Sequence, residues 1–157
     1  MRKKLFKKVL VAILILFVLL QFIRPKKNVG LAATATDITH FVQVPDTVLS
    51  ILKNSCYDCH SNYTNYPWYA EISPMSLLLA RHIRLGKKEL NFSDFSQYNR
   101  RRTKSKLSSI GEQVEQREMP LKSYLLIHRN AALSDDEIKL IDNWTESAKA
   151  ELDSKNQ

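Results

Sequence analysis

The chain has 157 residues, a formal net charge of +8 and only three glycines. A chain of this length has room for one small domain behind a short N-terminal segment. The whole excess charge lies in residues 1–28, which hold eight Lys or Arg and no acid, while the rest of the chain has sixteen basic and sixteen acidic residues. This distribution argues against a nucleic-acid-binding protein, whose folded domain would carry the positive charge.

The N-terminal segment predicts a helix that crosses the cytoplasmic membrane. Residues 5–23 are apolar except for two lysines and one glutamine, and as a helix they would be about 28 Å long, against roughly 30 Å for a hydrocarbon core. Residues 1–8 contain five basic residues and no acid, so we expect residues 1–25 to be a single-pass anchor with the following domain on the periplasmic, or outer, side. A cleaved signal peptide is the alternative, with Ala33-Thr34-Ala35 as the cleavage-like sequence.

The remaining chain predicts an all-α, cytochrome c-like domain of four to five helices, because helical spacing recurs and alternation with period two is rare. Residues 26–43 are expected to be a linker, residues 44–150 the domain and residues 151–157 a disordered tail. Helices are expected from Asp46 into the 56–60 region, from Ser73-Pro74 to Leu85, over residues 104–116, and from a capping box at residues 134–137 through Trp144.

The most informative motif is Cys56-Tyr57-Asp58-Cys59-His60, which has the spacing of a covalent c-type haem attachment site. On a helical turn, positions i, i+3 and i+4 share one face. Two thiols could therefore reach the two vinyl groups of one porphyrin while the imidazole of His60 coordinates the iron. The predicted cofactor is one covalent haem c per chain, bound by Cys56, Cys59 and His60.

Three other interpretations of this motif remain open. A structural zinc site needs four ligands, which the two cysteines and one or two histidines would have to supply. A thioredoxin-like redox pair would need a βαβ pattern, and none is seen around the motif. A plain disulfide suits an exported domain but gives His60 no role.

The basic run Arg100-Arg101-Arg102 with Lys104 and Lys106 is the main charged cluster of the outer domain. Such a run is typical of a solvated helix face. The alternatives are a docking patch for an acidic redox partner and a contact for haem propionates.

Short segments along the chain, taken in order, resemble the bacterial haem-binding domain family that carries a CxxCH motif. The matching segments are residues 56–62, 66–69, 72–74, 90–93 and 118–121, Tyr124 with His128, and residues 133–144. The resemblance covers roughly residues 44–148. It implies a membrane-tethered or exported haem protein similar to cytochrome c, and it leaves the pathway open.

In a cytochrome c-like fold, a loop methionine before the last helix is commonly the second axial ligand, and Met119 matches it by order along the chain. Pro120 would keep Met119 out of helix, since the residue before a proline disfavours the α region. The alternative ligands are His82 and, further, His128, because imidazole suits iron. Trp68 is expected to contact the porphyrin, as a large ring suits a flat apolar ligand. For each of these residues, ordinary core packing is the competing interpretation.

The predicted function is single-electron transfer by a membrane-anchored monohaem cytochrome with redox proteins as partners. Met/His ligation favours electron transfer, whereas an open iron position would indicate a gas or peroxide sensor. Enzymatic activity is not expected, because no acid–base pair stands out near the motif; a peroxidase using Arg81 and His82 is the third alternative. Nothing in the sequence indicates an oligomer.

Overall fold

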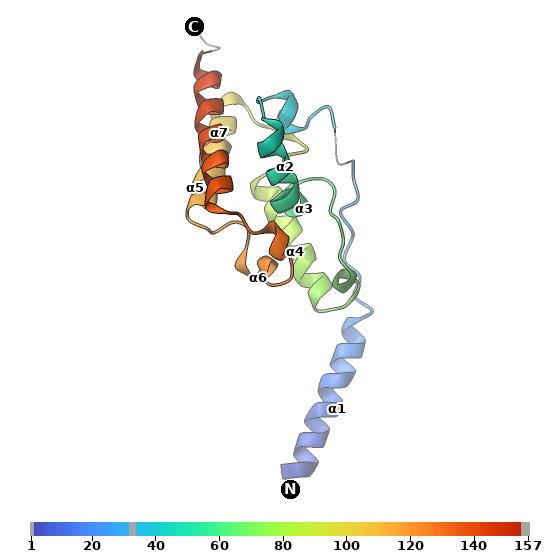
Figure 1. The fold of residues 1–157 in the computed structure, drawn as a ribbon. Helices are drawn as coiled ribbons and strands as arrows, with labels where there is room; N and C mark the ends of the chain where they lie inside the picture. The colour runs from blue at the N-terminus through green and yellow to red at the C-terminus, as the bar shows by residue number, and fades with distance from the viewer. Residues whose placement is uncertain (1, 32–33, 155–157) are drawn as a thin grey trace.

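The computed structural model describes residues 2–31 and 34–154, and in these ranges it contains seven α-helices and no β-strand (Figure 1). The predicted all-α class is therefore confirmed. The α-helices are α1 (Arg2–Leu20), α2 (Asp46–Ser55), α3 (Tyr57–His60), α4 (Met75–Glu89), α5 (Arg100–Glu115), α6 (Lys122–Leu125) and α7 (Asp135–Ser154). Short 3-10 helices lie between them: η1 (Ile38–His40), η2 (Trp68–Glu71), η3 (Phe95–Gln97) and η4 (Arg129–Ala131). The domain has more helices than expected. The helix predicted from Asp46 into the 56–60 region breaks at Cys56, and the one-turn helix α6 forms after Pro120.

Helix α1 projects away from the body of the molecule (Figure 1). The expected membrane-spanning helix is not found: within the described residues, no helix has both the length and the apolar character to cross a bilayer. The helix ends at Leu20, and the side chain of Gln21 is held by two hydrogen bonds to the backbone of Ser73, both of 3.0 Å. Because the first eight residues contain five charges, only residues 9–20 of α1 are continuously apolar. Such a segment is about 18 Å long, against a hydrocarbon core of roughly 30 Å.

The segment predicted as a linker, residues 26–43, lies along the body and makes specific contacts with it. The side chain of Asn28 donates to the carbonyl of Ser61 at 2.9 Å. Ile38 is fully buried, and its N–H donates to the carbonyl of Phe92 at 2.8 Å. These contacts hold most of the segment against the domain. Ala33, in the cleavage-like sequence, lies outside the described residues.

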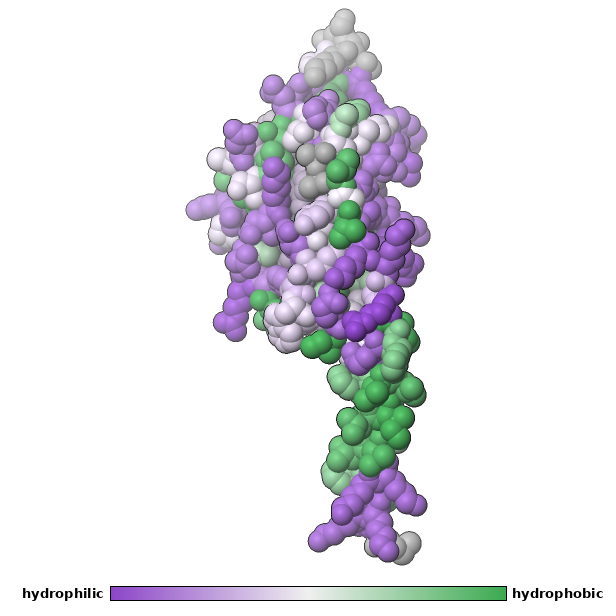
Figure 2. All heavy atoms as spheres, turned by 90° about the vertical axis from the view of Figure 1, so that its right-hand side faces the viewer, coloured by the Kyte–Doolittle hydropathy of each residue, from purple (hydrophilic) through white to green (hydrophobic). Residues whose placement is uncertain are grey.

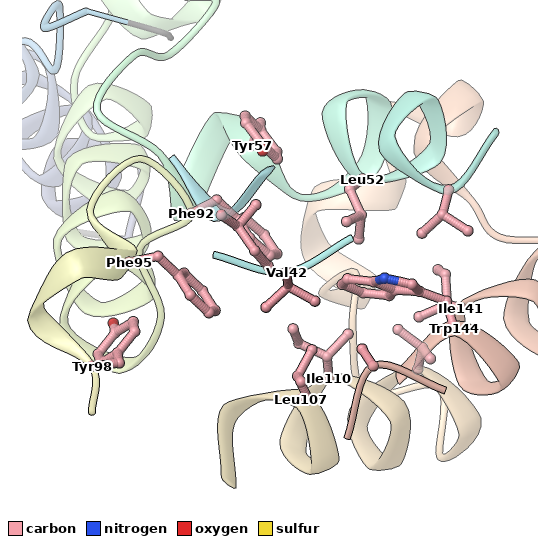
Figure 3. Close-up of a cluster of buried hydrophobic side chains, with 14 of the residues drawn as sticks. Val42, Leu52, Tyr57, Phe92, Phe95, Tyr98, Leu107, Ile110, Ile141 and Trp144 are labelled. Carbon is pink, nitrogen blue, oxygen red and sulfur yellow. The ribbon is translucent and has the colours of Figure 1, made fainter. Parts of the chain in front are cut away.

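The main hydrophobic core lies where α2, the loop around η3, α5 and α7 meet (Figure 3). Helices α5 and α7 lie side by side, and each presents an apolar stripe at i, i+3 and i+7 spacing. The stripes are Leu107, Ile110 and Val114 on α5, and Ile141, Trp144 and Ala148 on α7. Trp144 is 5% exposed, and its indole N–H donates to the carbonyl of Gln43 at 2.9 Å. The predicted helix from the capping box through Trp144 is confirmed.

Side-chain caps decide where the last two long helices begin. The side chain of Asn99 accepts from the N–H of Arg102 at 2.9 Å, so α5 starts four residues before the predicted Lys104. At α7, the N–H of Ser134 donates to Glu137 at 2.8 Å and the N–H of Glu137 donates to the Ser134 hydroxyl at 3.3 Å. This reciprocal pair is the predicted capping box.

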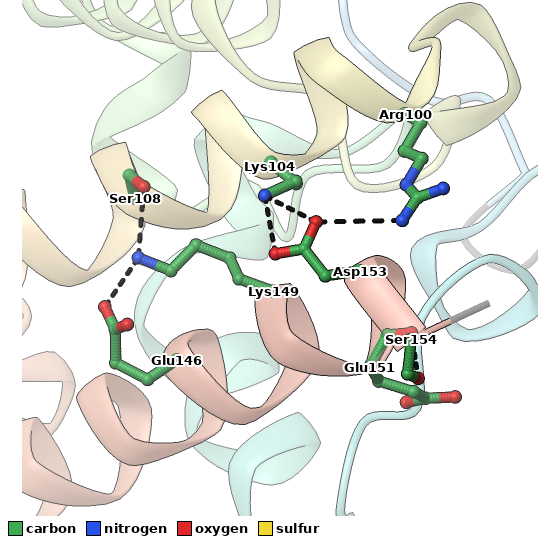
Figure 4. A network of polar contacts seen from close by, with 8 residues as sticks. All are labelled: Arg100, Lys104, Ser108, Glu146, Lys149, Glu151, Asp153 and Ser154. Carbon is green, nitrogen blue, oxygen red and sulfur yellow. Dashed lines mark hydrogen bonds and ion pairs between the residues drawn. The ribbon is translucent and has the colours of Figure 1, made fainter. Parts of the chain in front are cut away.

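The basic run lies on the first turns of α5 and is partly neutralised by α7 (Figure 4). Lys104 contacts both carboxylate oxygens of Asp153 at 2.8 Å, and Arg100 lies 3.7 Å from the same group. Arg101 and Arg102 are exposed to solvent. Residues 151–154, predicted to belong to a disordered tail, are thus the helical end of α7; residues 155–157 lie outside the described part of the chain.

Candidate haem site

The CxxCH motif forms one tight turn at the junction of α2 and α3. Cys56 leaves helical geometry, with φ −127° and ψ −39°, and thereby separates the two helices. The carbonyl of Cys56 accepts from the N–H of Cys59 at 3.1 Å and from that of His60 at 3.0 Å. The motif residues therefore lie within a single turn, as their spacing predicts.

His60 has its ring held in one orientation by the backbone. Its Nδ1 lies 3.0 Å from the carbonyl oxygen of Leu90. Since a carbonyl oxygen can only accept, Nδ1 carries the proton and donates. Burial lowers the pKa of His60, so the imidazole is neutral. The lone pair is then on Nε2, which is the state that a metal-binding imidazole requires.

The two cysteines are not joined in a disulfide. Burial, with a contribution from Cys59, raises the pKa of Cys56 to about 12. Burial, with a contribution from Asp58, raises the pKa of Cys59 to about 11. Both are therefore neutral thiols at pH 7. In the described ranges, no group of three or more His, Cys, Asp or Glu side chains is arranged to hold a metal ion.

A cavity of about 320 Å³ opens beside the motif. It brings together Cys56 and His60 from the motif with Met119 and Pro120 from the loop before α6. Its apolar wall is formed by Leu90, Phe92, Ile110 and Val114. The volume lies within the range of small-molecule and cofactor sites, which are mostly apolar with a few fixed polar groups. An imidazole nitrogen and a thioether sulfur between apolar walls suit a flat apolar group with a metal at its centre.

The sequence model of the haem-binding domain family matches residues 15–147. The chain belongs to this family. No curated protein and no solved structure shows significant similarity to it.

Not every residue predicted for this haem-binding domain lies at the cavity. Cys59 packs instead against a second apolar cluster formed by Tyr69, Ala70, Leu79 and Ile83. Trp68 is 77% exposed and is absent from the cavity lining. His82 is half-buried on α4 and is likewise absent from that lining. The structure thus groups Cys56, His60 and Met119, while Cys59, Trp68 and His82 lie outside the cavity lining.

His128 is engaged in packing contacts rather than in the cavity. It lies 2.6 Å from the hydroxyl of Tyr69 and stacks on the ring of Tyr124 at a centroid distance of 4.1 Å. Tyr124 in turn donates to the carboxylate of Asp58, the third residue of the CxxCH motif, at 2.9 Å. The same carboxylate accepts from the N–H of Asn65 at 3.1 Å. Burial, together with Asp58, raises the pKa of Tyr124. The motif turn is thereby tied to the segment that follows Met119.

Two residues of the site were not singled out from the sequence for these roles. Asp58 is a variable position of the CxxCH pattern, and its contacts with Tyr124 and Asn65 give it a structural role. The helix predicted to end at Leu85 continues through Gly86 to Glu89. A Cβ at Gly86 would lie 2.8 Å from the carbonyl oxygen of Cys59. Position 86 requires a residue without a Cβ, because α4 lies against the backbone of the haem motif at this point.

Gly86→Ala is expected to destabilise the domain. Alanine in a helix interior is favoured over glycine by about 1 kcal/mol, but overpacking a rigid backbone contact costs typically 1–3 kcal/mol. Since the clashing atom is a main-chain oxygen, we expect a net loss of about 1 kcal/mol in the free energy of unfolding, measured by urea denaturation. A variant more stable than the parent would show that α4 does not press on the motif.

Proposed function

We propose that this haem-binding domain attaches one haem c through thioethers to Cys56 and Cys59, and that it transfers single electrons on the outer side of the cytoplasmic membrane. The observation that carries the proposal is the hydrogen bond between His60 Nδ1 and the carbonyl of Leu90, 3.0 Å long. It leaves Nε2 free on the turn that also holds both thiols.

Different residues of the cavity would bind different parts of the cofactor. His60 and Met119, which both line the cavity, would be the two protein ligands of the iron. Phe92, Ile110 and Val114 supply the apolar surface that excludes water. Lys106, the basic residue of the lining, supplies a counter-charge for the propionates. When bound, the haem supplies a one-electron redox couple, whose potential Met/His ligation raises.

Covalent attachment is tested with the Cys56→Ser/Cys59→Ser double variant. Full-length protein is produced with a haem-c maturation system, and haem staining on a denaturing gel is combined with the intact mass. We expect one haem per parent chain and none that survives denaturation in the double variant, because serine forms no thioether. An unmodified parent polypeptide would contradict the proposal.

Carbon monoxide distinguishes electron transfer from the alternative function, a gas or peroxide sensor. A six-coordinate iron with two protein ligands is expected to bind carbon monoxide poorly. Ready binding to the reduced parent protein, unchanged in Met119→Ala, would instead favour the sensor.

A further inference from the structure

A second, larger cavity of about 1130 Å³ lies between α4 and the chain that follows α1. Its lining contains none of the residues of the CxxCH motif. One acidic residue, Asp94, faces a set of six basic ones. The six, which we call the basic groove, are Lys26, Lys27, Arg81, Arg84, Lys87 and Lys88.

Most of the positive charge in the basic groove is not compensated by the protein. Lys27 forms an ion pair with Glu71, and Lys87 donates to the side chain of Asn28 at 2.8 Å. The other four basic residues make no ion pair or side-chain hydrogen bond within residues 2–31 and 34–154. Four cations in one cavity without partners predict an anionic ligand.

The walls of the groove are firmly held. Arg81, Arg84 and Lys88 are spaced three and four residues apart, so they lie on one face of α4. On the opposite wall, the backbone N–H of Asn28 donates to the hydroxyl of Tyr66 at 2.7 Å. The bond from Lys87 to Asn28 joins the two walls. The charges are thus presented by fixed elements, as a recognition site for phosphate requires.

An exposed apolar surface adjoins this charge. The large apolar side chains of α1 between Val9 and Leu19 are 43–60% exposed. Figure 2 shows them as a continuous hydrophobic column with hydrophilic side chains gathered on the body beyond it. The chain runs from this column directly into the groove wall at Pro25. An apolar segment beside a cluster of basic residues matches the acyl chains and headgroups of an anionic bilayer surface. An acidic protein or a free phosphate compound would match the groove alone.

We propose that the basic groove binds the phosphate groups of anionic phospholipid headgroups, with the apolar residues of α1 in contact with the same lipid. The guanidinium groups of Arg81 and Arg84 contact the phosphate oxygens, for which their paired N–H donors are suited. This site is independent of the haem and of electron transfer.

The test is flotation of the full-length protein with vesicles of phosphatidylcholine, alone or mixed with phosphatidylglycerol. Binding is expected to be stronger with phosphatidylglycerol and to weaken with salt. Arg81→Gln/Arg84→Gln should reduce this preference roughly 30-fold, because each basic residue at an anionic surface contributes about 1 kcal/mol and about 1.4 kcal/mol is tenfold.

The matched control is Arg101→Gln/Lys122→Gln, which removes the same charge from exposed sites on α5 and α6 outside the groove. It is expected to retain the parent's preference for phosphatidylglycerol. The proposal would be overturned if the two double variants lost the preference for phosphatidylglycerol to the same extent, or if the parent protein showed no such preference. A third outcome would also overturn it: inorganic pyrophosphate binds the parent but not Arg81→Gln/Arg84→Gln, while the two proteins bind vesicles equally well. The groove would then be a site for a free phosphate compound. Unchanged haem staining in all variants shows that the haem site is separate.

Discussion

Replacing His60 with alanine is expected to remove the low-spin spectrum of the haem protein. The ring of His60 is held in place because its Nδ1 donates to the carbonyl of Leu90, and the lone pair of Nε2 is then the one that can bind iron. Without it the iron keeps at most one protein ligand, and the Soret and visible bands should shift to those of a high-spin or solvent-ligated haem. Absorption spectra of protein purified under native conditions measure this change.

Two controls test whether the spectral change is specific to His60: a variant of a second histidine, and rescue of a His60 variant with added imidazole. His40 lies exposed in η1 and is absent from the lining of the haem cavity, so His40→Ala should leave the spectrum unchanged. In His60→Gly, added imidazole should restore the low-spin bands, provided that the thioethers still hold the haem. A parent-like spectrum for His60→Ala would mean that the iron is bound elsewhere.

Replacing Met119 with leucine is expected to lower the reduction potential and to open the iron to carbon monoxide. Leucine has a similar volume, and such swaps in a core usually cost less than about 1.5 kcal/mol, so the cavity wall should persist without its sulfur. We expect the potential to fall by at least about 0.1 V, within the roughly 0.8 V that axial ligands span in haem proteins. The weak methionine–iron band at the red end of the spectrum should disappear.

Met75→Leu is the control for this substitution. Met75 is a half-buried methionine that packs against the cluster of Tyr69 and Leu79 and is absent from the haem cavity. Its replacement should leave the potential and the red band unchanged. If Met119→Leu keeps both while His82→Ala loses them, His82 is the axial ligand.

The parts of the fold that could be predicted depend on neighbours in sequence. The capping box at Ser134 and Glu137 and the helix that runs from it through Trp144 depend on contacts within one helix, and both were found as expected. The helix break at Cys56 and the early start of α5 at Asn99 were missed. Each is a local choice between several acceptable backbone states, and the surrounding fold decides which is adopted.

In the candidate haem site, too, the features that depend on sequence neighbours were predicted and those that depend on distant segments were not. The spacing of Cys56, Cys59 and His60 placed all three in one turn, since i, i+3 and i+4 contacts need no distant partner. The expectation that Trp68 would line the site depended on how η2 packs, and Trp68 instead lies exposed. Asp58 and Tyr124, 66 residues apart, could be joined only by the folded chain.

The sequence by itself determined the CxxCH motif, the helical class and the separation of basic from neutral regions, because composition and short-range spacing are independent of packing. Tertiary structure alone decided that Leu90 orients His60, that Gly86 admits α4 to the motif, and that lysines and arginines from both ends of residues 26–88 converge on one groove. Contacts between distant segments depend on how side chains fill the space between helices, and no local pattern encodes that arrangement.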